Sequence, residues 1–159
     1  MRVEDVVESR DSGPKRRWRM VDQSGRFGVK DPAAIRLGHD ESLEMVLTIP
    51  SEVTVHLIDF RFHNIHTDQA KLDTGVIEAY LDEKRIVPTT PVWGRPLAPG
   101  FHVALPTMDW GTHAILVHDD QKLCRMLSGR QNHFSFKWKD DHERHSLLAK
   151  SFEYFLVTE

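Results

Sequence analysis

Hydrophobic and polar residues alternate along much of the chain with a period of two. The alternation is clearest at residues 43–49, 134–138 and 152–157. A period of two places successive side chains on opposite faces of an extended strand, so these segments are predicted to be half-buried β-strands. Residues 53–62 are rich in β-branched and aromatic residues and are apolar on both faces, which indicates a central strand.

Further short strands are predicted at residues 76–81, 85–87, 101–105 and 112–118. The first two flank Asp82-Glu83-Lys84 and predict a hairpin. Residues 123–127 fit either a strand or a short helical turn, and the pattern leaves both open. About two helical turns are predicted at residues 145–150.

Eight to nine short strands and very little amphipathic helix predict an all-β fold, a two-sheet antiparallel sandwich with jelly-roll-like topology. The length of 159 residues suits one domain. Residues 1–30 are polar and irregular, and we expect them to form an N-terminal arm or extended segment. Residues 31–159 are predicted to form a single β-sandwich domain.

The composition of the chain indicates where the protein is located and which classes of partner are unfavoured. A single cysteine cannot form an intrachain disulfide, and the acidic N-terminus does not resemble a signal peptide, so a cytoplasmic location is expected. The chain has no apolar run near 18 residues and a net charge of −3, which makes membranes and nucleic acid unfavoured partners. Residues 15–19 form a basic patch around Trp18 whose contact with a partner is left open.

The run of residues 43–87 resembles the front half of carbohydrate-binding-module and galactose-binding-like jelly rolls. The resemblance rests on the order of strands and loop and on the hairpin VIEAYLDEK at residues 76–84. Residues 151–157 are similar to the last strand of such modules. The resemblance implies a jelly-roll sandwich that binds a sugar.

A non-catalytic binding module for a small polar ligand such as a carbohydrate is the first functional hypothesis. Trp93 and Trp110 would supply apolar stacking surfaces on stiff loops, and Arg95, His102 and Asp109 would orient the ligand. The site would be built from the loops at residues 63–74, 88–100 and 106–111. Alternatively, the two tryptophans fill the open ends of the sandwich.

A second hypothesis is a small cupin- or dioxygenase-like enzyme that uses a divalent metal as cofactor. His66 and Asp68 have the His-x-Asp spacing that can supply two ligands from one extended segment, and His63 lies nearby. Because the chain contains 10 histidines, chance pairs at short spacing are also expected. The candidates for a further ligand are His102, His113 and His118.

Other catalytic classes find little support in the sequence. There is no Gly-x-Ser-x-Gly elbow and no glycine-rich phosphate loop, and the lone Cys124 is expected to be a buried small apolar residue. Whether the chain is an enzyme stays open, with binding favoured. A third hypothesis is a structural subunit of a homo-oligomer, in which residues 1–30 clasp a neighbouring copy.

Overall fold

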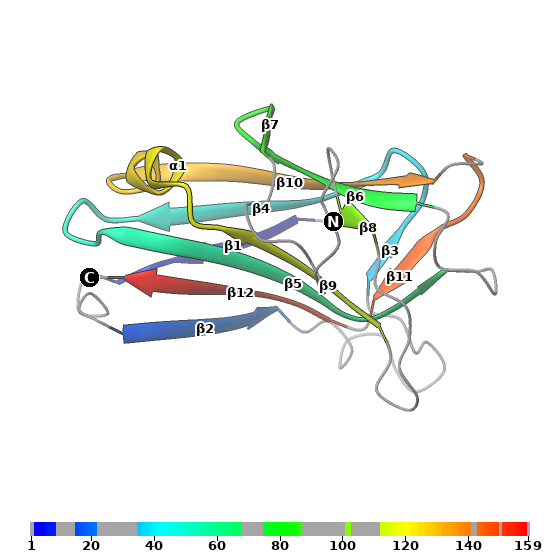
Figure 1. Cartoon of the computed structure of the whole chain (residues 1–159), viewed down its shortest axis with the longest axis horizontal. Coiled ribbons are helices and arrows are strands. Elements are labelled where there is room, and N and C mark those ends of the chain that lie inside the picture. Colours follow the sequence, from blue (N-terminus) through cyan, green and yellow to red (C-terminus); the bar gives the residue numbers. More distant parts are fainter. Residues whose placement is uncertain are drawn as a thin grey trace.

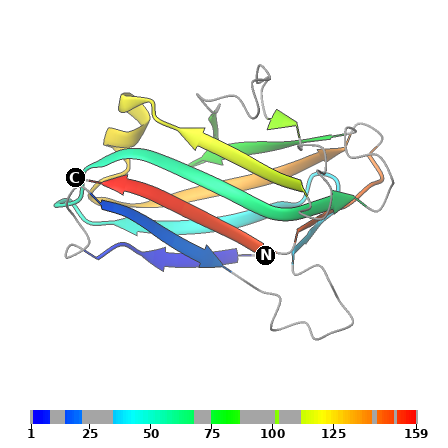
Figure 2. The ribbon, with the colours of Figure 1, turned by 60° about the horizontal axis from the view of Figure 1, so that its bottom comes forward.

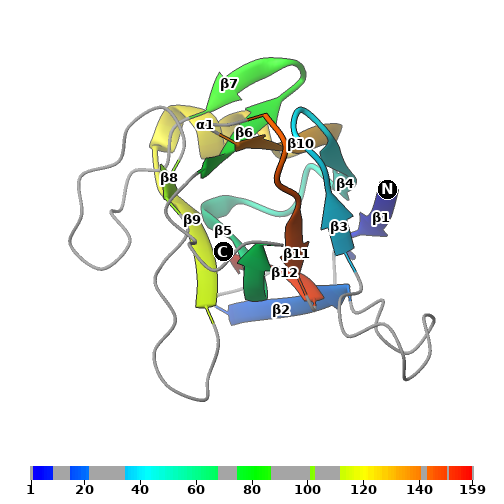
Figure 3. The same cartoon turned by 90° about the vertical axis from the view of Figure 1, so that its right-hand side faces the viewer.

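Two β-sheets pack face to face in the computed structural model of the chain, with one short helix at one end (Figure 1). The structure describes residues 2–8, 15–21, 35–67, 75–86, 101–102, 112–140, 143–149 and 151–158. Viewed from the end, the two sheets form separate layers (Figure 3).

The first sheet has β10 at its centre and carries the candidate site described below. Its strand order is β1-β4-β10-β6-β7, and β8 also pairs with β6. All pairings are antiparallel except that of β1 with β4, which is parallel. The strands are β1 (Arg2–Val6), β4 (Ser42–Ile49), β6 (Gly75–Leu81), β7 (Lys84–Ile86), β8 (Phe101–His102) and β10 (Arg130–Asp140).

The second sheet is organised around the long strand β5 (Figure 2). Its order is β2-β12-β5-β11-β3, and β9 pairs with β5. The strands are β2 (Lys15–Val21), β3 (Ile35–Leu37), β5 (Val55–Thr67), β9 (Thr112–His118), β11 (Leu147–Ala149) and β12 (Ser151–Thr158). The chain crosses between the sheets from β4 to β5 and from β9 to β10, which confirms the predicted two-sheet sandwich.

The helix α1 (Gln121–Met126) occupies the segment that the sequence left open. Its N-cap is Asp120, whose side chain accepts a hydrogen bond of 3.1 Å from the backbone N–H of Lys122. Only Cys124 of this helix is buried. No helix in the described part of the chain is long and apolar enough to cross a membrane.

Phenylalanine rings from both sheets form the centre of the core. Phe60 of β5 lies 4.9 Å from Phe134 and 4.7 Å from Phe136 of β10, measured between ring centroids. Phe136 also lies 5.3 Å from Phe152 of β12. Burying one such side chain contributes about 1.5–3 kcal/mol, and tilted ring pairs add about 0.5–1.5 kcal/mol. These contacts join the two sheets.

Two strands, β1 and β2, lie within residues 1–30, the segment expected to form an arm or extended segment. β1 pairs with β4, and β2 pairs with β12. Val3 and Val7 are buried, and the hydroxyl of Tyr154 on β12 donates a hydrogen bond of 2.5 Å to Asp5. The buried valines and the hydrogen bond to Tyr154 hold β1 against the rest of the sandwich. A short strand with few apolar residues becomes stable because β4 supplies a partner for its backbone.

Two further segments differ from the sequence expectation. β5 continues to Thr67, through the start of the loop expected at residues 63–74, because β11 and β9 supply partners for its last residues. The helical turns expected at residues 145–150 are replaced by β11. Leu147 and Ala149 are buried there at alternate positions, and pairing with β3 and β5 outweighs local helical preference.

His118 at the end of β9 is fully buried, with its ring 6.0 Å from that of Phe60. Neither ring nitrogen has a hydrogen-bond partner within the described residues. Burial lowers the pKa of His118 to about 4, while the neighbouring Asp119 acts weakly in the opposite direction. The folded protein therefore holds this ring in its neutral form.

Acid is expected to destabilise the fold through His118. The unfolded chain binds the proton near pH 6.5 and the folded chain only near pH 4, so stability falls as the pH drops through this window. The loss reaches about 3 kcal/mol at about pH 4. Urea unfolding at about pH 7 and pH 4 should show this loss in the wild type and a smaller one in His118→Leu. Equal pH dependence of the two proteins would contradict the assignment.

Candidate ligand-binding site

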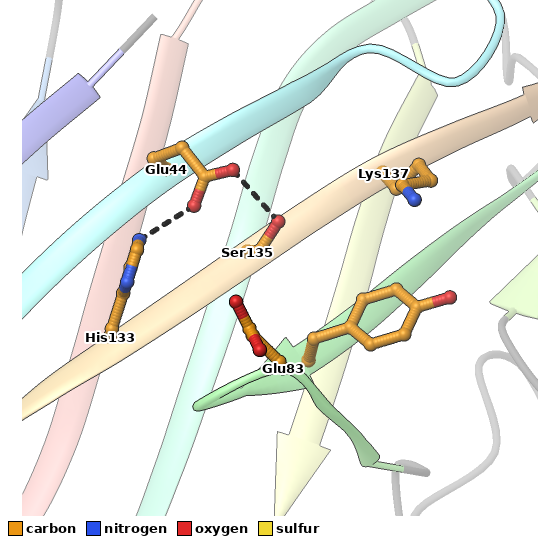
Figure 4. Close-up of a pocket in the computed structure, with 6 residues that line it drawn as sticks. Glu44, Glu83, His133, Ser135 and Lys137 are labelled. Carbon is orange, nitrogen blue, oxygen red and sulfur yellow. Dashed lines mark hydrogen bonds and ion pairs between the residues drawn. The ribbon is translucent and has the colours of Figure 1, made fainter.

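An open pocket of about 220 Å³ lies on the outer face of the first sheet (Figure 4). Its walls come from three strands and one turn, and its lining is mostly polar or charged. The residues that line it are Glu44, Tyr80, Glu83, His133, Ser135 and Lys137.

Strand register brings these distant residues together. Ser135 of β10 pairs with Glu44 of β4 on one side and with Tyr80 of β6 on the other. Directly opposed residues of neighbouring strands place their side chains on the same face of a sheet. His133 and Lys137 lie two positions before and after Ser135 on β10, so they share that face.

Glu44 is held in one orientation by two partners. Its Oε1 accepts a hydrogen bond of 3.1 Å from the Ser135 hydroxyl, and its Oε2 lies 2.8 Å from Nε2 of His133. The carboxylate therefore stands between the serine and the histidine. In a serine-protease relay the histidine contacts the serine, so this trio has the wrong order for that mechanism.

Tyr80 is fixed on the opposite side of the pocket. Its hydroxyl donates a hydrogen bond to Glu78, which also accepts one of 2.8 Å from Arg85. The ammonium of Lys137 lies 5.5 Å from the centre of the Tyr80 ring, within cation–π range. Burial, reinforced by the bond to Glu78, raises the pKa of Tyr80, so its hydroxyl stays protonated at neutral pH.

The pocket thus combines carboxylate acceptors, an ammonium donor and an aromatic ring on rigid strands. Sites for small polar ligands use such a combination, with a few fixed polar groups beside an apolar surface. Among the residues described, no group of three or more histidine, cysteine, aspartate or glutamate side chains could hold a metal ion.

The loop site predicted from the sequence falls largely outside the described residues. Trp93, Arg95, Asp109 and Trp110 all lie there. The backbone of His102 is described, and it belongs to β8 beside β6. This loop site stays a prediction.

The predicted metal ligands are distributed over several strands. His63 on β5 lies with its Nε2 3.0 Å from Oε2 of Glu153 on β12. The backbones of His66 and His113 belong to the neighbouring strands β5 and β9, and Asp68 lies outside the described residues. Whether these side chains meet, alone or with His102 of the other sheet, stays a prediction.

Cys124 is buried, as the sequence predicted. Its thiol lies 3.4 Å from the backbone carbonyl of His56 and 3.7 Å from that of His118. Burial, together with the nearby Asp119 and Asp120, raises the pKa of this thiol to about 11. At neutral pH it is neither ionised nor accessible, so it is not suited to act as a nucleophile.

The pocket residues do not stand out in the sequence, because they are ordinary outward positions of alternating strands. Every second residue of β10 faces outward, and three of these positions are His133, Ser135 and Lys137. Glu44 is an outward position of β4. Only the pairing of β10 with two strands distant in sequence unites them. The hairpin containing Tyr80 was the one available signal, and it was interpreted as a feature of the fold.

Comparison with known proteins finds distant structural likeness and no match in sequence. No protein-family model matches the chain, and no curated protein sequence matches it. The fold is similar to part of the mosquito-larvicidal Cry4Aa toxin from Bacillus thuringiensis, with a TM-score of 0.40 and 9% sequence identity. The alignment covers 89% of this chain and 21% of the toxin chain, so this chain spans about a fifth of that protein.

The thiol of Cys124 should resist alkylation in the folded protein. Burial and a raised pKa both suppress thiolate formation, so iodoacetamide at about pH 8 should leave the native protein unmodified in a mass spectrum. The same reagent should modify the chain once it is unfolded in urea. Rapid stoichiometric alkylation of the folded protein would contradict the described burial.

Proposed function

We propose that the protein is a non-catalytic binding module for a small polar ligand and that the ligand is a carbohydrate. The observation that carries the proposal is the pocket on the outer face of the first sheet, where the fixed carboxylate of Glu44 faces the ring of Tyr80 across β10. The sugar binding implied by the sequence resemblance points to the same ligand class.

The lining groups match the chemistry of a sugar. Hydroxyls both donate and accept hydrogen bonds, so they suit carboxylate acceptors such as Glu44 together with the ammonium donor of Lys137. The ring of Tyr80 offers an apolar surface to C–H groups. The pocket is smaller than the roughly 300–1,000 Å³ of drug-sized sites, which favours one sugar residue as the occupant.

Preorganisation supports binding at this place. Glu44 is held by two partners, and the hydroxyl of Tyr80 is held by Glu78, so few side chains need to lose freedom when a ligand enters. All residues that line the pocket, except Glu83, belong to paired strands. Rigid strands position a recognition site more accurately than loops do.

Calorimetric titration with methyl glycosides of glucose, galactose, mannose and xylose tests the proposal. At least one glycoside should bind the wild type. Tyr80→Ala removes the stacking ring and Glu44→Gln removes a charged acceptor whose hydrogen bond contributes about 1.5–3 kcal/mol, so each should weaken binding about tenfold or more. Lys139→Ala is the matched control, because Lys139 follows Lys137 at the next outward position of β10 but is paired with Asp40 outside the pocket.

Each variant should keep the circular-dichroism spectrum of the folded protein. The proposal is wrong if no glycoside binds, or if the two pocket variants bind as tightly as Lys139→Ala. Trp93→Ala and Trp110→Ala separate the two places proposed for the ligand. They should leave binding unchanged if the sheet pocket is the site, whereas loss of binding in these variants alone would assign it to the loops.

A further inference from the structure

Glu83 occupies a backbone conformation that normally belongs to glycine. Asp82 and Glu83 form the two-residue turn between β6 and β7, and their φ angles are +48° and +68°. A hairpin turn with both φ angles positive strongly favours glycine in its second position. A residue with a Cβ is strained there, and a glutamate has no special tolerance for this conformation.

Asp82 has a structural reason for its place in this turn, whereas Glu83 has none. The carboxylate of Asp82 forms an ion pair with Arg130, and its backbone N–H donates a hydrogen bond of 2.8 Å to the carbonyl of His133. Glu83 forms no hydrogen bond or ion pair with any other described residue. Strained residues of this kind cluster at ligand-binding and active sites.

The side chain of Glu83 belongs to the pocket wall (Figure 4). Glu44, the other lining carboxylate, is already bonded to His133 and Ser135. Glu83 is therefore the carboxylate whose oxygens are available to donors on a ligand. A carboxylate accepts from hydroxyls and binds still more strongly to an ammonium group.

The charge of the lining favours a cationic ligand. Glu44 and Glu83 carry two negative charges and Lys137 carries one positive charge, which leaves the lining at −1 when histidine is counted as neutral. Lys137 also lies over the Tyr80 ring, and this cation–π contact partly offsets its positive charge. An ammonium group beside Glu83 would balance this excess.

We propose that Glu83 makes the pocket selective for hydroxylated ligands that carry an ammonium group, of which amino sugars are the class. The inference rests on the proposed function and names its ligand. The strained turn places Glu83 in the pocket wall, and the ammonium of the ligand takes the place beside its carboxylate. Anionic sugars are disfavoured by the same carboxylate.

Three probes that differ only at carbon 6 of glucose test this charge preference. They are the methyl glycosides of 6-amino-6-deoxyglucose, glucose and glucuronic acid, which are cationic, neutral and anionic at neutral pH. Titration calorimetry of the wild type should rank them in that order, with about tenfold or more between the cationic and anionic probes. Glu83→Gln should reduce this ratio about tenfold.

Thermal unfolding supplies a second readout that does not require a ligand. Glu83→Gly should raise the melting temperature by about 2–4 °C because glycine relieves the turn, while it loses the charge preference. Glu83→Gln keeps the strained backbone and should melt like the wild type. Glu52→Gln is the matched control, since Glu52 is an exposed glutamate of the β4–β5 turn outside the pocket.

The outcomes separate this inference from the proposed function. Absence of binding by every neutral and charged sugar overturns both. Binding without preference for the cationic probe, or a preference that survives in Glu83→Gln, overturns only the role of Glu83. A melting temperature that falls in Glu83→Gly would show that Glu83 stabilises the turn, and would contradict the argument from strain.

Discussion

Phenylalanine rings packed between the two sheets determine which face of each strand points inward. Phe60 contacts Phe134 and Phe136, and this commits the even-numbered positions of β10 to the core. The odd-numbered positions must then face outward. A slip of one residue would exchange the two faces, so the apolar core also fixes which polar residues line the pocket.

Carboxylates on the outer faces of both sheets are paired within the protein, and Glu83 is an exception. On the second sheet, Asp59 binds Arg61 at 2.9 Å and Glu153 lies 3.0 Å from His63, and both carboxylates are almost entirely buried. These charges are compensated within the protein. On the first sheet, the exposed Glu83 has no partner among the described residues. Glu44 and Glu78 of that sheet are paired with His133 and Arg85, so Glu83 is the pocket carboxylate that the proposal assigns to the ligand.

Much of the fold could be predicted from the sequence, because alternation with a period of two is a local signal. The cores of β4, β9, β10 and β12 were found in this way. The strand β11 and the end of β5 could not be predicted, because their pairing depends on strands far away in the sequence. The pocket was missed for the same reason: Glu44 and Ser135 lie 91 residues apart and meet only through register. The predicted loop and metal sites stay untested.

Mapping of a bound sugar by ¹H–¹⁵N nuclear magnetic resonance shows whether the pocket on the first sheet is the ligand site. The probe is the methyl glycoside of 6-amino-6-deoxyglucose, added stepwise to uniformly labelled protein. If the sugar binds there, backbone amide signals should shift saturably at Ser135 and Lys137 of β10 and at Glu83 in the β6–β7 turn. Shifts confined to other parts of the chain, or no shifts, would contradict binding in this pocket.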